Sequence, residues 1–302
     1  MSQTSETIDP WSTYWTAIVV ATTNLFWITI ATTITQFVLM VLVAWHEYQA
    51  RFKTALSPIN LRILGLALFN LISYIFQTIG VNTTDPTVYS TTMAVGNACS
   101  YLLSFLIIEY GWIRGFNIVQ QCFKNSIPYL RFMLIFYGVL QLTQGVLYAW
   151  ISFTNQSTPE YANLTTIEAY LSLGAQVIAF AFDFFLLGVF IVYLRRGRED
   201  ATLIDTERLS VVARYGILSF WVNQVCLVAT VALYFVFGMV EPPISITAVI
   251  IIYYIENCAP IVYVFLQIAM KWSIHVAREA AMSNNRSSAT TENKTPRLSR
   301  KN

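Results

Sequence analysis

Seven long apolar stretches, separated by shorter polar segments, set the hydrophobic pattern of this chain of 302 residues. A transmembrane helix needs about 20 mainly apolar residues, because each residue advances the helix by about 1.5 Å through a hydrocarbon core about 30 Å thick. All seven stretches are long enough. They predict helices near Asn24–Glu47, Asn60–Gly80, Thr91–Trp112, Tyr129–Phe153, Thr166–Leu194, Val211–Val240 and Ser245–Trp272.

The composition agrees with this pattern. The mean hydropathy is +0.56, 56% of the residues are hydrophobic and only 11% are charged. Backbone polar groups cannot be left unpaired in hydrocarbon, so the spanning segments must be helices of one bundle. The predicted fold is therefore all-α, a seven-transmembrane helix bundle in an integral membrane protein.

The basic residues predict how the chain crosses the membrane. All 18 Lys and Arg residues fall in four clusters that occupy every second gap between the apolar stretches and the C-terminal tail. Cytoplasmic loops of membrane proteins retain Lys and Arg close to the ends of the spanning helices. The pattern predicts an N-terminus outside the cell and a C-terminus inside it.

This topology divides the chain into three parts. They are a short extracellular N-terminus (1–23), a seven-transmembrane domain (24–272), and an amphipathic segment with a disordered cytoplasmic tail (273–302). Asp9 followed by Pro10 is typical of a helix N-cap and first helical position. The pair indicates that the first helix begins well before the membrane.

The predicted outer face carries acidic residues without basic partners, among them Asp85, Glu160 and Glu168. It also carries three glycosylation sequons, at Asn82, Asn155 and Asn163. Glycans are attached outside the cytosol, so use of these sites would agree with the charge pattern. The sequence therefore predicts a glycoprotein.

Two stretches resemble a known family. Ser57-Pro58-Ile59-Asn60, followed by Leu66-Ala67-Leu68-Phe69-Asn70, resembles the start of helix two in rhodopsin-like (class A) G-protein-coupled receptors. Ala259-Pro260-Ile261-Val262-Tyr263 resembles the Asn-Pro-x-x-Tyr motif of helix seven in the same family. Proline inside a helix removes a backbone hydrogen bond and permits a kink. Lys271 to Met282 resembles the short amphipathic helix that follows in these receptors.

Other positions depart from the family. Asn70 and Ala259 replace the family's aspartate and asparagine. In helix three the family has an arginine directly after an acidic residue, whereas here Glu109 is followed by Tyr110 and Gly111, and Arg114 comes about a turn later. The resemblance covers the whole chain in topology but only two helices in motif. The sequence suggests a divergent member of the family.

Polar residues inside the predicted spans are candidates for function, because a charged group at the bilayer centre costs roughly 2.5–3.5 kcal/mol. Glu256 and Asn257 are expected to meet Asn70 and Asn97 in a polar core. Pro260 and Tyr263 would form a switch beside this core. Asp183 is expected either to make a structural hydrogen bond to a neighbouring helix or to act as a switch. Hydrogen bonds between helices are expected from Gln141, Gln144, Gln176, Asn223 and Gln224.

A second group of residues lies near the predicted cytoplasmic face. Glu109 is expected to pair with Arg114 or Arg131. The residues expected to contribute to coupling with a cytosolic partner are Glu109, Tyr110, Arg114, Arg131, Arg195 and Arg196.

The resemblance implies a plasma-membrane receptor that transmits an extracellular signal to a heterotrimeric G protein. Its ligand would enter the bundle, and membrane lipid would surround it. No enzyme, metal, cofactor or nucleic-acid signature is present in the sequence. A seven-helix transporter or lipid-translocating protein is the alternative, and a scaffold without a ligand remains a third possibility.

Overall fold

A computed structural model describes residues 11–48, 57–155, 157–196, 203–237 and 244–292. Its elements within these ranges are seven α-helices and one short 3₁₀ helix. They are α1 (Ser12–Tyr48), α3 (Pro58–Asn82), α4 (Pro86–Cys122), η1 (Lys124–Ser126), α5 (Ile127–Phe153), α6 (Pro159–Arg196), α7 (Leu203–Phe237) and α8 (Ile246–Glu292).

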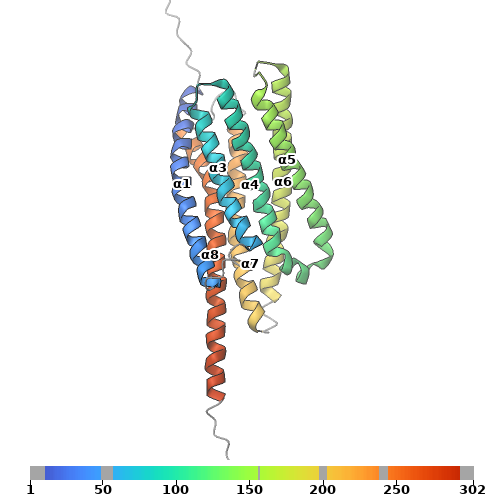
Figure 1. The fold of residues 1–302 in the computed structure, drawn as a ribbon. Coiled ribbons are helices and arrows are strands. Elements are labelled where there is room, and N and C mark those ends of the chain that lie inside the picture. Colours follow the sequence, from blue (N-terminus) through green and yellow to red (C-terminus); the bar gives the residue numbers. More distant parts are fainter. Residues whose placement is uncertain (1–10, 49–56, 156, 197–202, 238–243, 293–302) are drawn as a thin grey trace, which may run out of the picture.

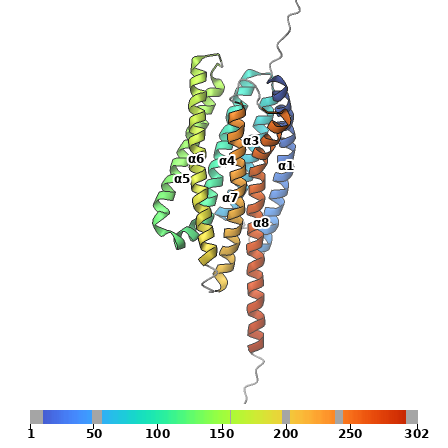
Figure 2. The same cartoon turned by 180° about the vertical axis from the view of Figure 1, so that it is seen from behind.

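The seven α-helices run side by side along one axis (Figures 1 and 2). Each is long and apolar enough to cross a membrane. The predicted all-α seven-helix bundle is confirmed. We call the end where α1 begins the N-terminal end, and the opposite end, past which α8 projects, the C-terminal end.

Local sequence signals set where two of the helices begin. The Ser57 side chain accepts a hydrogen bond from the backbone N–H of Asn60 ahead of α3, and Pro58 follows it at the first position. Asp85 caps α4 in the same way by accepting from the N–H groups of Thr87 and Val88. These caps pair backbone donors that have no partner inside the helix.

Two helices extend past the predicted spans, and for α1 the sequence already indicated a start well before the membrane. Residues 12–23, predicted as extracellular N-terminus, form the beginning of α1, whereas Asp9 and Pro10 lie outside the described residues. The amphipathic segment from Lys271 is not a separate helix, because α8 continues without a break to Glu292 (Figure 2). Part of the predicted disordered tail is thus helical, and 293–302 lie outside the described residues.

The bundle is most densely packed in its half toward the C-terminal end. One buried cluster joins α4, α5, α6, α7 and α8 around Ile118, Phe182 and Phe190. A second joins α1, α3, α4 and α8 around Leu66 and Tyr263. Large apolar side chains also point outward, where hydrocarbon replaces water as solvent, including Trp27, Phe37, Phe132, Val146 and Phe235.

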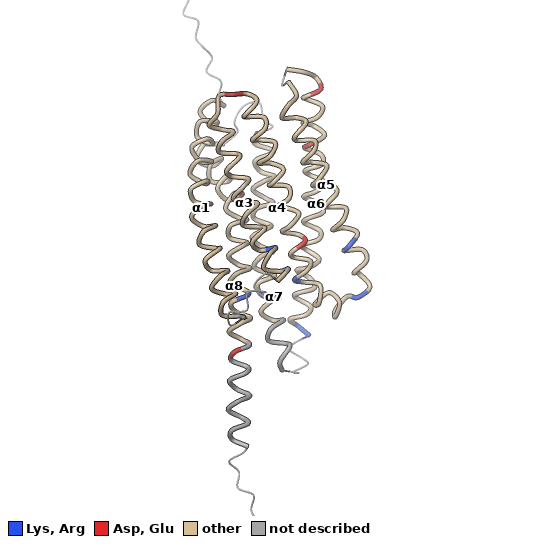
Figure 3. Tube along the Cα trace, in the orientation of Figure 1, with Lys and Arg blue, Asp and Glu red and all other residues tan. Residues whose placement is uncertain are grey.

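The described Lys and Arg residues lie in the half of the bundle toward the C-terminal end, whereas Asp and Glu residues occur along its whole length (Figure 3). This arrangement reproduces in space the separation seen along the sequence. By the rule for basic residues, the C-terminal end is the one expected to face the cytosol.

Glycosylation offers a test of that orientation. Asn155 is exposed in the short connection between α5 and α6, whereas Asn82 ends α3 and donates through its side chain to the Thr78 carbonyl, and Asn163 lies inside α6. We expect Asn155 to carry a glycan, because it alone of the three is in a loop. Removal of N-glycans should shift the mobility of the wild-type protein on a gel but not that of Asn155→Gln.

The control is Asn285→Gln, which removes a sequon in α8 beyond the C-terminal end of the bundle. It should leave the mobility shift intact. If the mobility shift is lost in Asn285→Gln and kept in Asn155→Gln, the bundle has the opposite orientation in the membrane.

Candidate functional site

A polar cavity of about 740 Å³ lies inside the half of the bundle toward the N-terminal end. Trp15, Tyr89 and Phe237 line it near that end, and Asp183 and Asn223 lie at its deepest part. Ligand pockets typically measure about 300–1,000 Å³ and combine apolar walls with a few polar groups. In size and lining this cavity is suited to a small organic molecule.

The structure brings most of the predicted polar core together at this cavity. Asn70, Asn97, Glu256, Asn257 and Pro260 all line it, from α3, α4 and α8. Tyr263 does not line it. That side chain lies deeper, where its hydroxyl donates to the Ile107 carbonyl at 3.3 Å.

Asn257 connects three helices around the cavity wall. The hydroxyl of Tyr74 on α3 donates to the side-chain oxygen of Asn257 on α8. The Asn257 amide donates to the Tyr253 carbonyl at 2.7 Å, and the Tyr253 hydroxyl lies 2.9 Å from the Thr22 hydroxyl on α1. These bonds fix the amide of Asn257 and join α8 to α1 and α3.

Pro260 leaves a gap in the hydrogen bonds of α8. Proline has no N–H, so the carbonyl of Glu256, four residues earlier, has no partner within the helix. The Cys226 thiol of α7 donates to that carbonyl at 3.5 Å. One turn away, the Gln36 amide of α1 donates to the Ile261 carbonyl at 3.1 Å. Side chains of two neighbouring helices thus contact α8 where its own bonding is weakest.

The floor of the cavity is an interhelical hydrogen bond. The Asn223 amide of α7 donates to the Asp183 carboxylate of α6 at 3.0 Å. The structural hydrogen bond expected for Asp183 is therefore present. Asp183 and Asn223 also line a small void on the far side of the floor, together with Arg114, Ser219 and Tyr263.

Arg114 lies within the bundle directly beyond this floor. Its Nη1 donates to the Ser219 hydroxyl at 3.1 Å and to the Gln267 side-chain oxygen at 2.9 Å. The Gln267 amide in turn donates to the Ser219 hydroxyl at 2.8 Å, and the guanidinium lies 5.7 Å from the centre of the Phe190 ring. Arg114 therefore joins α4 to α6, α7 and α8.

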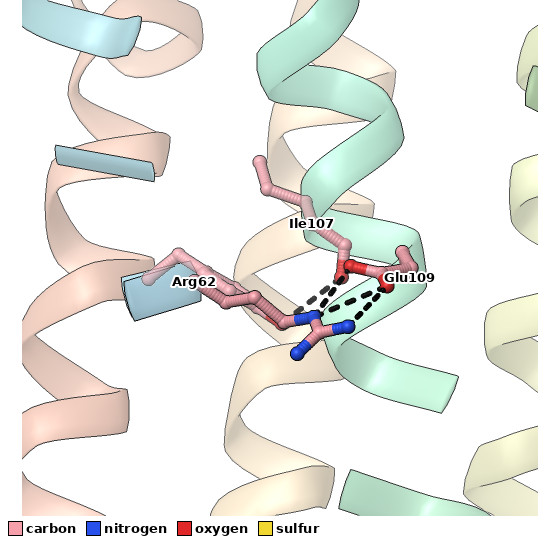
Figure 4. Close-up of polar contacts among 4 residues, drawn as sticks. Arg62, Ile107 and Glu109 are labelled. Carbon is pink, nitrogen blue, oxygen red and sulfur yellow. Dashed lines mark hydrogen bonds and ion pairs between the residues drawn. The ribbon is translucent and has the colours of Figure 1, made fainter. Parts of the chain in front are cut away.

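The predicted pairing of Glu109 is wrong. Neither Arg114 nor Arg131 contacts it. Arg62 of α3 instead donates through Nε and Nη2 to the Glu109 carboxylate of α4, with distances of 3.0–3.1 Å (Figure 4). The two-pronged contact matches the fork of the guanidinium to the carboxylate.

The other predicted coupling residues are split between the interior and the surface. Tyr110 is only 1% exposed and packs edge-on against the Tyr263 ring. Arg131 lies over the Phe116 ring, with the guanidinium 5.8 Å from its centre. Arg195 and Arg196 are exposed at the end of α6. Among the predicted coupling residues, the exposed charged side chains are those of Arg131, Arg195 and Arg196.

Glu168, predicted to lie on the outer face, is buried within the bundle. It is 8% exposed, and its carboxylate accepts hydrogen bonds from Tyr101 at 3.0 Å and Tyr234 at 3.3 Å. The sequence does contain a signal for this position. Thr158 caps α6 and Pro159 begins it, which places Glu168 about 14 Å along the helix.

Comparisons with models of known protein families and with curated proteins find no match. The class of protein is therefore defined by the fold and the cavity. It is a seven-helix integral membrane protein with a polar cavity in one half and a packed core around Arg114 in the other.

The ion pair between Arg62 and Glu109 should contribute to stability, because both side chains are partly shielded from solvent. We expect Glu109→Gln to lower the free energy of unfolding by about 1–2 kcal/mol. Thermal unfolding of the purified protein in lipid nanodiscs would measure the loss. The double variant Arg62→Gln/Glu109→Gln should cost less than the sum of the single variants, and strict additivity would show that the pair contributes nothing.

Gly216 of α7 permits the close approach of Phe190, the ring beside Arg114. A Cβ at this position would lie 2.3 Å from a ring carbon of Phe190. Gly216→Ala should lower the free energy of unfolding by about 1–3 kcal/mol, because the buried ring must move. The matched control is Gly188→Ala on α6, where a Cβ would contact nothing within 4 Å. It should raise helix stability by about 0.5–1 kcal/mol, and equal effects of both changes would contradict the packing described.

Proposed function

We propose that this protein is a plasma-membrane receptor, in which a ligand in the cavity shifts the bundle between two states that a cytosolic heterotrimeric G protein distinguishes. The observation that carries the proposal is the shared floor. Asp183 and Asn223 line the ligand-sized cavity on one side and the void beside Arg114 on the other. A ligand that moves Asp183 or Asn223 would therefore act directly beside Arg114, which joins the helices of the other half.

The orientation expected from the basic residues supports this role. With the C-terminal end in the cytosol, the cavity belongs to the outer half of the bundle and is approached from outside the cell. The exposed Arg195 and Arg196, with Arg131, then lie at the cytosolic end. They provide positive charge for a partner with an acidic surface.

Helix α8 is the element best placed to connect the two halves. Glu256 lines the cavity and Gln267 contacts Arg114, and both belong to α8, about 16 Å apart along its axis. Between them lies Pro260, where the helix lacks one of its own hydrogen bonds. A ligand that contacts Glu256 differently in two states can therefore shift the position of Gln267.

A receptor and a transporter or lipid-translocating protein make different demands on the packed half. Beyond the floor, the bundle is filled by side chains with almost no exposure, including Ile63, Leu66, Tyr110, Ile118, Phe182 and Tyr263. A transporter must open a path through this region, whereas a receptor needs only to repack it. A transporter would move a substrate across proteoliposomes without any G protein.

The test is nucleotide exchange. Full-length protein in nanodiscs should accelerate GTP uptake by at least one of a panel of purified heterotrimeric G proteins covering the main Gα classes, relative to empty nanodiscs. Arg114→Gln should change this basal rate several-fold, because it removes the contacts to Ser219 and Gln267. Arg131→Gln removes the same charge from the surface and should have a smaller effect.

If no heterotrimer in the panel takes up GTP faster with the protein than with empty nanodiscs, the receptor proposal is overturned. An exchange rate altered by Arg131→Gln but not by Arg114→Gln would show that surface charge alone, and not the interior contacts, governs coupling.

A further inference from the structure

The charge of the cavity lining is one-sided. Asp183 and Glu256 contribute carboxyl groups, and the lining contains no Lys, Arg or His side chain. Within the part of the chain that the structure describes, no basic side chain forms an ion pair with Glu256. A carboxylate inside a membrane bundle is costly without a counter-charge. A cationic ligand would provide that charge.

Aromatic side chains surround the same space. Ten of the lining residues are Tyr, Trp or Phe, and two of them, Tyr74 and Tyr253, are hydrogen-bonded to Asn257, the residue next to Glu256. The face of an aromatic ring attracts an ammonium group, most strongly where water is excluded. The walls are therefore suited to an organic cation rather than to a hydrated metal ion.

A second and independent feature is a pair of unpartnered acceptors. Gln141 and Gln144 of α5 line the cavity and are 7% and 1% exposed. The side-chain oxygen of each is buried without a hydrogen-bond partner. Buried polar atoms are almost always paired in native proteins, so these two oxygens call for a donor that the chain itself does not supply. These oxygens therefore do not make the hydrogen bonds between helices that the sequence predicts for the two residues.

We propose that the cavity binds a protonated organic amine that carries a second hydrogen-bond donor. Glu256 pairs with the ammonium group, tyrosine rings enclose it, and the second donor reaches Gln144 or Gln141. This inference rests on the cavity being the ligand site of the proposed receptor and adds the chemical class of the ligand.

The same lining disfavours other ligands. A carboxylate or phosphate would meet Asp183 and Glu256 with no basic residue to offset the repulsion. A purely apolar lipid would leave the oxygens of Gln141 and Gln144 unpaired, and an unpaired buried acceptor is costly. Both classes are poorer partners than an amine.

Three related compounds provide the test. Tryptamine has an ammonium group and an indole N–H, tryptophol replaces the ammonium with a neutral hydroxyl, and 1-methyltryptamine lacks the indole N–H. Binding to the full-length protein in nanodiscs of zwitterionic phosphatidylcholine is measured by calorimetry, with empty nanodiscs subtracted. Tryptamine should bind at least tenfold more tightly than tryptophol, and 1-methyltryptamine should lie between them.

Variants assign the contacts. Glu256→Gln should abolish the preference for tryptamine over tryptophol, whereas Glu160→Gln, the same change at an exposed carboxyl outside the cavity, should preserve it. Gln144→Met should remove the advantage of tryptamine over 1-methyltryptamine. Comparing the compounds on the wild-type protein needs no variant, so the test stands even where Glu256→Gln fails to fold.

Equal affinity for tryptamine and tryptophol, or a preference that persists in Glu256→Gln, would overturn the proposal. So would complete loss of tryptamine binding in dilute sodium chloride with no loss in choline chloride of the same ionic strength, because the site would then belong to an inorganic cation. Binding is measured without a G protein, so failure here leaves the coupling test intact, and failure of coupling leaves this result intact.

Discussion

Hydrocarbon around the bundle is the constraint from which the rest of the structure follows. A polar group inside a membrane finds no water, so it must be paired within the protein or face an internal cavity. The outward faces of the helices accordingly carry large apolar side chains, while Asp183, Glu168 and Arg114 point inward. These inward groups divide the bundle in two: a half that closes tightly around Arg114 and a half that remains hollow beside Glu256.

The two halves differ in how their interior is filled. In the packed half, Arg114 donates to Ser219 and Gln267, and Gln267 donates to Ser219, so little can move there without breaking several contacts at once. Around the cavity, Glu256 lines the open space, and the side-chain oxygens of Gln141 and Gln144 are buried without a hydrogen-bond partner. Unpaired buried atoms occur in both halves, because the Tyr110 hydroxyl and Arg114 Nε also lack a partner. What sets the second half apart is the open space beside Glu256, into which a ligand can bring its own hydrogen-bond donors.

The spans were predictable because a run of some 20 apolar residues has few other uses, and the polar positions Asn70, Asn97, Glu256 and Asn257 were predictable because each interrupts such a run. Helix ends were predictable only in part. The Asp9-Pro10 pair indicated an early start for the first helix, and α1 begins at Ser12, whereas an apolar window cannot locate the end of α8, which continues in polar sequence to Glu292. Glu168 was misplaced for the same reason, since its depth depends on where α6 begins at Pro159. The partner of Glu109 depends on how α3 packs against α4, which no local pattern in either segment specifies.

The position of Arg114 explains how this chain departs from the family that it resembles. Arg114 lies five positions after Glu109, and at about 100° per residue the two side chains point in directions about 140° apart around α4. They therefore cannot pair with each other. Glu109 faces α3 and is paired with Arg62, while Arg114 faces α7 and α8 and reaches Ser219 and Gln267. In the family motif the acid and the arginine are adjacent and share one end of the helix. Here Tyr110 stands directly after Glu109, and Arg114 lies one turn beyond Tyr110 along the same face of α4, inside the bundle and beside the void that Asp183 also lines.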